Sequence, residues 1–265
     1  MSRLKTYLYL SWRFRVIAAM KLMEHRADFW FWSFVSVMWT AFNFFFFALL
    51  VNVRGDIAGW TPGEMYLLLG VFTIFDSIIW TLFYHNMQHY TSDVFSGELN
   101  HLLLKPIDTQ FMLMTKDNNF TNLLRFFTGI GIVIWSIFNL GLQPSIGQLL
   151  LFVVMVLVML LFIYFFWFTL STIAFWVDKI DNINEVIPNI RRTFQVPHQV
   201  YTGFISIILT VIFPFALVSS VPSEILLGRG QVPLMVYMTL FTALVVVFSR
   251  WFFNYSVKKF SGIAN

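Results

Sequence analysis

The residues of this chain that are best suited to chemistry are few and scattered. His85, His89 and Asp93 follow one another at intervals of four, so on a helix they would share one face and resemble part of a zinc site. A zinc site needs further ligands, and solvated loop histidines are the more ordinary interpretation, so we predict no metal. The chain has no cysteine, which excludes disulfides and cysteine-based metal sites.

The motifs that would give the chain an enzymatic activity of its own are missing. No G-x-x-x-x-G-K-[ST] phosphate loop occurs, so the chain cannot bind and hydrolyse ATP in that way. No H-E-x-x-H motif occurs either, and no Ser-His-Asp arrangement can be argued from the spacing. We therefore expect no catalytic residue and no cofactor in this chain.

Asp76 is the sharpest of the remaining polar residues, because it lies inside an apolar run. A carboxylate within a membrane span is costly and usually faces the bundle interior or a water-filled path. It could attract a cationic substrate, or it could be a neutral acid that donates a hydrogen bond to a neighbouring helix. Asn43 is also polar within a run, and we place both residues on a candidate substrate path.

Six long apolar runs must position these residues. Each run approaches the ~20 residues that a helix needs to cross the hydrocarbon core of a bilayer. Inside lipid no water can satisfy the backbone, so the runs must be helical. We therefore predict an all-α, polytopic membrane protein with six transmembrane helices. The runs are Phe29 to Val53, Met65 to Phe83, Leu123 to Leu142, Leu149 to Val177, Phe204 to Val221 and Val232 to Phe253.

The positive charges are sorted by these runs. If the N-terminus is cytoplasmic and the chain crosses six times, the outer side carries only Arg54 and Arg229 of the 17 lysines and arginines. This asymmetry follows the positive-inside rule and predicts that both termini are cytoplasmic. The net charge of +4 is then explained by topology and by attraction to anionic lipid headgroups, and we predict no nucleic-acid partner.

Residues 1–27 are expected to form an amphipathic helix that lies at the membrane surface. Apolar residues recur there at helical spacing, and basic residues fill much of the other side. The alternative is a solvated helix that merely orients the first span. We favour the interfacial helix because its aromatic residues are costly to leave in water. The apolar positions are Leu4, Tyr7, Leu8, Trp12, Val16 and Ala19.

The inner loop 84–122 contains an apolar stripe that predicts a second amphipathic helix. Ser92 and Asp93 are candidate N-caps, and Pro106 ends the helix, which gives roughly three turns. The stripe could rest on lipid or could dock into a groove of a partner protein, and the periodicity does not distinguish these roles. The stripe consists of Val94, Phe95, Leu99, Leu102 and Leu103.

The second inner loop, from Asp178 to Tyr201, carries a charge pattern. Its acidic residues come first and its basic residues follow, an order that complements a helix dipole, so we predict a short helical extension of the fourth span. The acids are Asp178, Asp181 and Glu185, and the bases are Arg191 and Arg192.

In the stretch from Phe213 to Gly228, Pro214 lies inside an apolar run and Pro222 follows it. Proline frees a backbone carbonyl and kinks a helix, so we predict a broken, partly re-entrant segment at the outer leaflet. A mild kink in a plain span is the alternative.

The order of these parts resembles the type-2 export permeases, the membrane subunits of ATP-binding-cassette exporters, in a branch linked to drug, daunorubicin or viologen export. The resemblance covers essentially the whole chain, as a single permease domain over residues 1–265. The most specific feature is the G-E-L-x-x-L-L-L-[KR]-P pattern at Gly97 to Pro106. The basic N-terminal helix, the proline-broken segment and Gly59 to Leu68 support it.

The resemblance implies an assembly in the bacterial inner membrane. Such subunits pair with a second copy or a sister permease and bind two separate ATPase subunits, which carry the ATP and Mg. The loop 84–122 would hold the coupling helix, and residues 213–231 would form the outer gate with Pro214, Pro222 and Glu224. Asn100 stands where an acidic residue is common, so we assign no salt bridge there. The coupling residues would be Val94, Phe95, Glu98, Leu99, Leu102, Leu103, Lys105 and Pro106.

We therefore expect a subunit that exports an amphiphilic or cationic small molecule by alternating access, with no covalent chemistry. Export of a lipid or a lipid-linked glycan is an alternative within the same fold. An ion-gradient-driven carrier would require inverted repeats with paired broken segments, and we see a break in one half of the chain alone. An intramembrane enzyme would require several acids or histidines at one depth, and Asp76 is alone.

Overall fold

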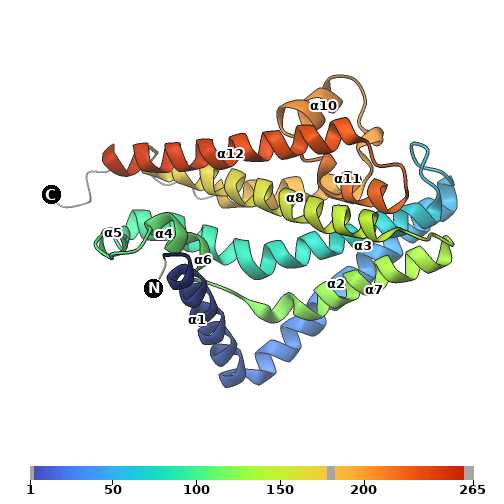
Figure 1. The fold of residues 1–265 in the computed structure, drawn as a ribbon. Coiled ribbons are helices and arrows are strands. Elements are labelled where there is room, and N and C mark those ends of the chain that lie inside the picture. Colours follow the sequence, from blue (N-terminus) through green and yellow to red (C-terminus); the bar gives the residue numbers. More distant parts are fainter. Residues whose placement is uncertain (1–2, 178–182, 260–265) are drawn as a thin grey trace.

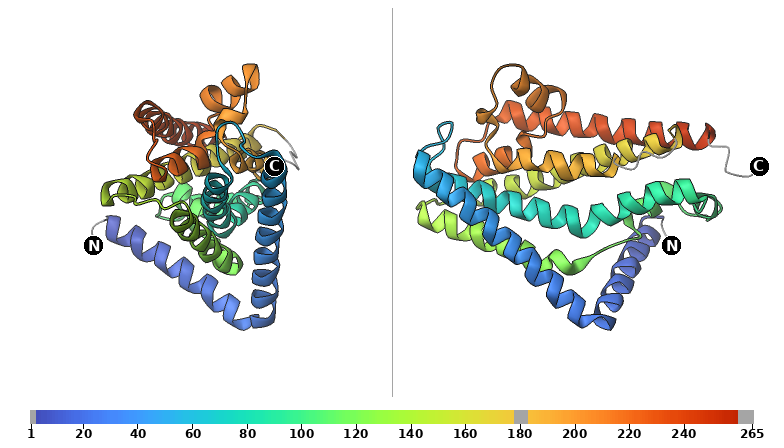
Figure 2. Two further views of the ribbon diagram at one scale, coloured as in Figure 1. Left: turned by 90° about the vertical axis from the view of Figure 1, so that its right-hand side faces the viewer. Right: turned by 180° about the vertical axis from the view of Figure 1, so that it is seen from behind.

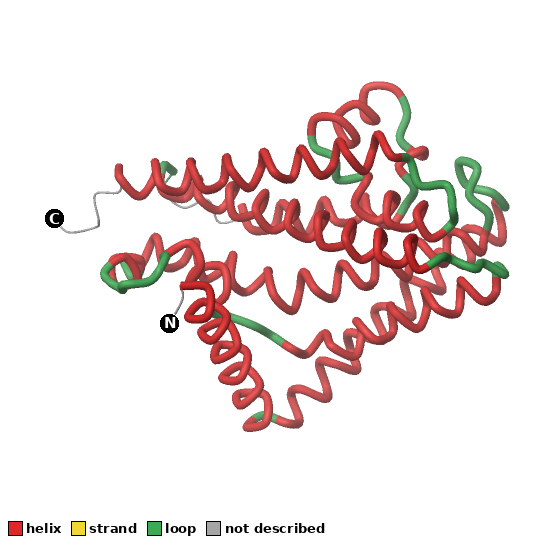
Figure 3. The backbone as a smooth tube through the Cα atoms, viewed as in Figure 1, coloured by secondary structure: helices red, strands yellow, loops and turns green. Residues whose placement is uncertain are grey.

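The computed structural model describes residues 3–177 and 183–259, and every element of secondary structure in that part of the chain is a helix (Figure 1, Figure 3). The longer helices are α1 (Arg3–Glu24), α2 (Arg26–Arg54), α3 (Pro62–Ile78), α4 (Tyr84–Ser96), α7 (Leu123–Asn139), α8 (Ile146–Thr172), α11 (Leu217–Leu226) and α12 (Val232–Lys259). The shorter ones are α5 (Leu99–Leu103), α6 (Thr109–Thr115), α9 (Val186–Ile190) and α10 (Gly203–Ile207). Single turns of π- or 3₁₀-helix are η1 (Ile79–Phe83), η2 (Phe120–Asn122), η3 (Ile173–Phe175), η4 (Ile183–Glu185), η5 (Arg191–Gln195), η6 (His198–Val200) and η7 (Ile208–Ile212).

The expected all-α membrane fold is confirmed. Among the described residues, five helical stretches are long and apolar enough to cross a membrane, and a bent helix pair would be the sixth. They agree with the six apolar runs to within a few residues at most ends, although α3 continues through η1 into α4. The stretches are Arg26–Val51, Pro62–Ser96, Phe120–Asn139, Ile146–Phe175 and Val232–Lys259, and the bent pair is Gly203–Ile212 with Leu217–Leu226.

The bundle has two distinct ends (Figure 1). We call the end that carries the connections 55–61, 140–145 and 227–231 the short-loop end. We call the end that carries α5 and the end of α12 the termini end. Two helices begin at the short-loop end with a capping box, at Thr61 for α3 and at Ser145 for α8. In each box, the side chain of the residue three positions after the cap accepts a hydrogen bond from the backbone N–H of the cap residue. This bond satisfies a backbone donor that the helix itself leaves without a partner.

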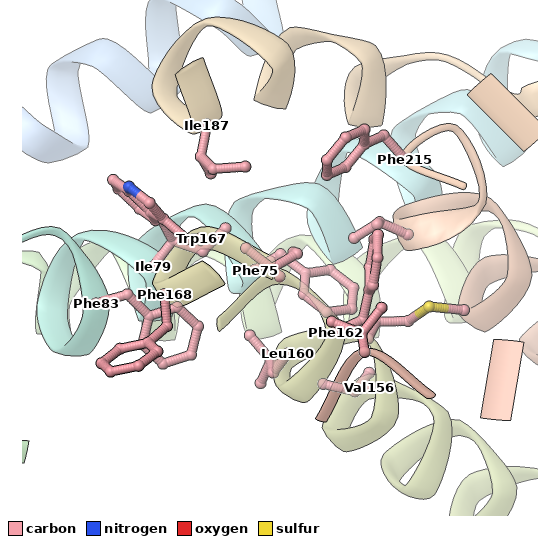
Figure 4. Close-up of a cluster of buried hydrophobic side chains, with 14 of the residues drawn as sticks. Phe75, Ile79, Phe83, Val156, Leu160, Phe162, Trp167, Phe168, Ile187 and Phe215 are labelled. Atoms are coloured by element: carbon pink, nitrogen blue, oxygen red, sulfur yellow. The ribbon is translucent and has the colours of Figure 1, made fainter. Parts of the chain in front are cut away.

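The core is aromatic and lies around α3 and α8. Phe75, Phe162, Trp167 and Phe168 are fully buried, and Phe215 from the bent pair packs against Phe162 at 5.4 Å between ring centroids (Figure 4). By contrast, α1 and α2 form a corner that projects away from this core (Figure 2). Many aromatic side chains of α2 are exposed, Trp30, Trp32 and Trp39 among them. Such a surface is suited to lipid or to another protein rather than to water.

The structure corrects our assignment of residues 178–201 as an inner loop. Residues 178–182, including Asp178 and Asp181, lie outside the described part of the chain. Three contacts place the rest alongside α3. Tyr84 donates to Glu185 at 3.3 Å, Arg191 pairs with Asp76 at 2.5 Å, and Trp60 donates to Gln199 at 3.2 Å.

These contacts show that residues 185–199 run antiparallel to α3. Residues 60 to 84 would span about 36 Å as a helix, which is close to the hydrocarbon thickness of a bilayer. The irregular segment of η4, α9, η5 and η6 therefore makes the crossing that we had assigned to Phe204 to Val221. The positive charges of Arg191 and Arg192 had counted toward the inner side, and they lie instead partway along α3.

The bent pair is thus an additional feature at the short-loop end. Its two helices meet at an angle of 81° around Phe213 to Ala216. Tyr237 of α12 donates to the Val211 carbonyl at 2.5 Å, and Gln148 at the start of α8 donates to the Ile225 carbonyl at 3.5 Å. The break at Pro214 was expected, but the pair begins at Gly203, ten residues before our boundary, and Pro222 lies inside α11 without breaking it.

Two glycines allow α3 and α7 to pack closely. A Cβ at Gly129 would lie 3.0 Å from the Ile74 backbone nitrogen, and one at Gly70 would lie 3.0 Å from that of Val133. Backbone atoms cannot move aside as a flexible side chain can. Small residues therefore set the approach of these two helices, as they commonly do in membrane bundles.

We predict that Gly129→Ala lowers the thermal unfolding temperature in detergent, with a cost of about 1–3 kcal/mol from overpacking. Gly131→Ala is the matched control, because it lies in the same helix and a Cβ there meets nothing within 4 Å. Alanine is the better helix former at both positions. Equal melting temperatures for the two variants would contradict the close contact.

Candidate functional site

A buried carboxylate with two arginine partners lies at the centre of the bundle. Asp76 is fully buried, its Oδ1 accepts a hydrogen bond from Arg191 Nη1 at 2.5 Å, and its Oδ2 forms an ion pair with Arg125 Nη2. The three residues come from α3, from η5 and from the first turn of α7. One carboxylate therefore holds together three segments that are far apart in sequence.

This cluster carries excess positive charge. Burying a charge is costly unless it is paired, and Asp76 supplies one negative charge for two cations. Arg125 is 7% exposed, and its Nε has no hydrogen-bond partner within the described residues. The Arg191 guanidinium also lies 5.5 Å from the Trp80 ring centroid, a cation–π contact that partly stabilises it.

A cavity of about 820 Å³ lies beside the cluster. Aromatic residues of α2 line one side of it, including Trp32, Trp39 and Phe46. Trp80 of η1, the connection 119–122 and residues of η5 line the rest. Arg125, Arg191 and Arg192 all reach its surface, and Arg192 is exposed and forms no hydrogen bond or ion pair within the described residues.

The two residues of the predicted substrate path lie in this region, but they differ in access. Asn43 lines the cavity, and its side chain donates to the Trp39 carbonyl at 2.8 Å. Asp76 does not line it and is covered by its arginines. Sequence reasoning missed Arg191 and Arg192 as site residues because it placed them in a loop. The available signal was Asp76 itself, since a buried acid requires a cation.

The first inner loop differs from the single helix that we predicted. Gly97 has φ 78°, a left-handed conformation that ends α4, and α5 is a separate helix of five residues. Ser92 and Asp93 do not cap a helix but lie within α4, where Asp93 pairs with Lys116 at 2.5 Å. The apolar spacing continues across Gly97, whereas the helix does not.

Burial divides the proposed coupling residues into two groups. Val94, Leu99 and Leu102 are buried in the chain's own core, and Phe95 and Leu103 pack partly against it. The outward surface, which we call the α5 surface, includes the other three proposed coupling residues, Glu98, Lys105 and Pro106. A partner that docks here would contact the α5 surface and not the buried Val94, Leu99 and Leu102 of the apolar stripe. Its members are Glu98, His101, Leu104, Lys105 and Pro106.

Asp108 connects the α5 surface to both ends of the chain. Its Oδ1 accepts from the Phe111 backbone at 3.0 Å as the N-cap of α6 and from Arg250 of α12 at 3.0 Å. Its backbone nitrogen donates to the Tyr7 hydroxyl of α1 at 3.3 Å. Burial alone would raise the pKa of Asp108, but the hydrogen bonds from Arg250 and the backbone outweigh it and hold the pKa below the ordinary value of 3.8.

A polar cluster lies at the short-loop end, where we predicted the gate. Glu224 of α11 is buried and accepts from Gln199 at 2.6 Å. Arg229 pairs with Glu64 at 3.2 Å and lies 4.3 Å from the Trp60 ring centroid. Glu224 therefore ties the bent pair to the irregular segment, while Pro214 lies at the bend.

The histidine row has other partners. His85 lies 3.4 Å from the Asn119 side chain, and His89 pairs with Asp117 at 2.8 Å. Within the described residues, no group of three or more acids, histidines or cysteines could hold a metal ion.

Comparison with protein families assigns the chain. The model of the ABC-2 family transporter proteins matches residues 37–263. The chain belongs to this family. The permease is thus a membrane component of an ABC transporter, a class that works with an ABC ATPase subunit and has no ATPase site of its own. Comparisons with curated proteins and with solved structures found no match.

We predict that Asp76→Asn destabilises the permease by about 3–5 kcal/mol, because it leaves two arginines without their counter-charge. Thermal unfolding in detergent measures the change. Asp56→Asn is the control, because Asp56 is exposed in the 55–61 connection, and this variant should unfold like the wild type. A fully stable Asp76→Asn protein would show that the cluster does not hold the bundle together.

We predict a second effect at Asp108. Because its folded pKa is lowered, the contact with Arg250 contributes stability above the ordinary pKa of 3.8 and loses it as the pH falls further. Asp108→Asn should therefore melt below the wild type by a constant margin from about pH 8 to pH 5. The margin should shrink in more acidic buffer, and a margin that grows there would contradict the assignment.

Proposed function

We propose that this permease pairs with a second copy or a sister permease and binds two ATPase subunits to form an exporter in the bacterial inner membrane. The termini end would face the cytoplasm, in accordance with the positive-inside distribution of charge. ATP and Mg would be bound by the ATPase subunits. Alternating access would expose the cavity beside Asp76 first to the inner side and then to the outer side.

The observation that carries this proposal is the arrangement around the α5 surface. It presents charged and apolar side chains to a partner, and Asp108 connects the same loop to α1 and α12. Force applied to the loop by an ATPase would therefore reach two helices directly. At the opposite end, the bent pair and Glu224 would form the outer gate.

We propose an amphiphilic small molecule as cargo, because aromatic side chains and arginines line the same cavity. The argument for a cationic cargo depended on Asp76 as the counter-charge. Asp76 is already paired with two arginines, so that argument loses its support. A lipid or lipid-linked glycan is the second candidate, and the arginine lining favours one that carries an anionic group.

We predict that purification from native membranes recovers an ABC ATPase with the permease, and that Leu104→Asp or Glu98→Lys abolishes this recovery. Both side chains are exposed, Leu104 at 83%, so the permease should still fold. Substrate-stimulated ATP hydrolysis of the reconstituted complex should be lost in parallel.

Ile146→Asp is the matched control for Leu104→Asp. Ile146 is 78% exposed and lies at the opposite end of the bundle, in the first turn of α8, where an acid is favourable. It should retain the ATPase. If Leu104→Asp also retains it, the docking surface lies elsewhere, and a permease that pumps without any ATPase would refute the proposed function.

A further inference from the structure

We infer that the cavity beside Asp76 binds the phosphate or carboxylate group of an anionic amphiphile, with Arg192 as its principal free contact. This inference rests on the proposed role of the cavity as the substrate path and specifies the chemistry of the substrate. It is the opposite charge class from the cationic cargo expected from the sequence.

The first support is the charge balance of the cavity. Three arginines line it, and within the described residues Asp76 is the one carboxylate that pairs with any of them, namely with Arg125 and Arg191, which leaves an excess of two positive charges. The neighbouring acids are Glu185, bonded to the Tyr84 hydroxyl, and Asp117, paired with His89. Neither lines the cavity, so an anionic ligand would meet cations at its wall.

The second support is the depth of these charges. Asp76 lies about 21 Å along α3 from Pro62, well inside the thickness of a hydrocarbon core. Arg192 follows the arginine that pairs with Asp76, so it lies at a similar depth while remaining exposed. A charged side chain at this depth must face water, an anion or another protein surface rather than lipid.

The third support is the backbone that carries the arginines. Residues 183–201 cross alongside α3 as short helical turns, and irregular backbone is tolerated in a membrane where it is buried or lines a water-filled cavity. Ile187 and Phe194 anchor one side of this segment in the core, while Arg191, Arg192 and Gln195 line the cavity. One side of this segment is therefore polar and lines the cavity within the membrane-spanning part of the protein.

The shape of the lining indicates an amphiphile rather than a small free anion. Guanidinium groups form paired hydrogen bonds with phosphate or carboxylate, so the arginines on the η5 side are suited to bind the charged group of the ligand. The α2 side offers Trp32, Trp39 and Phe46, which suit an alkyl or aromatic tail. A ligand with a charged group and an apolar tail would satisfy both sides at once.

The test is binding to the full-length permease in a neutral detergent, followed by tryptophan fluorescence, since Trp32, Trp39 and Trp80 line the cavity. The probes are dodecyl phosphate, dodecyltrimethylammonium and inorganic phosphate. Dodecyl phosphate should bind best and should weaken as salt is added. Equal or tighter binding of the ammonium probe would overturn the inference, and inorganic phosphate that binds as well as dodecyl phosphate would overturn its amphiphile part.

Arg192→Gln is the decisive variant, because Arg192 is exposed and forms no hydrogen bond or ion pair with the described residues. It should weaken dodecyl phosphate binding about tenfold, as expected for one lost charge-assisted hydrogen bond. Arg15→Gln removes an exposed charge from α1, outside the cavity, and should bind like the wild type. Unchanged binding in Arg192→Gln would overturn the inference, and separation of paired subunits by it would instead assign Arg192 to a subunit contact.

A second binding experiment shows whether the natural ligand of the cavity is a membrane lipid or a transported cargo. In nanodiscs of phosphatidylcholine, addition of phosphatidylglycerol should displace dodecyl phosphate if a lipid headgroup is the natural occupant. Continued binding of dodecyl phosphate would assign the site to a cargo, and both results support the anion site. The assay contains no ATPase, so its failure is distinguishable from failure of the proposed ATPase partnership.

Discussion

The ion pairs of Asp76 are the interaction on which the rest of the structure depends. A carboxylate inside a membrane bundle must find cations, and here one comes from α7 and the other from a segment 115 residues later in the chain. The pairs fix the path of that later segment beside α3. The same segment also forms one wall of the cavity, because Arg192 and Gln195 line it beside Arg191.

The same constraint explains why one crossing of the bundle is irregular. A regular helix through residues 183–201 would have to accommodate two prolines, at Pro188 and Pro197, and several polar side chains. Short turns let Ile187 and Phe194 reach the core while the arginines reach the carboxylate and the cavity. The same short stretch of chain therefore supplies both the polar side chains that line the cavity and the apolar side chains that pack in the core.

Sequence reasoning recovered what depends on long, local patterns. Five apolar runs became membrane-length helices, and Pro214 marked the bend of the helix pair, because length, hydropathy and proline geometry act over neighbouring residues. It failed where contacts are distant. Arg191 looked like a loop cation because nothing in its neighbours shows Asp76, and the stripe from Val94 to Leu103 looked like one helix although Gly97 divides it.

Asp108 also constrains the order in which the chain can be completed. Its partner Arg250 lies in the last helix, 142 residues later, so the loop that carries α5 and α6 cannot be secured until the final span has left the ribosome and inserted. Until then the carboxylate has its cap donor Phe111 but no cation, and Tyr7 contacts the backbone nitrogen of Asp108 alone. The loop that carries α5 and α6 is therefore the part of this permease that is secured last, after every membrane helix is in place.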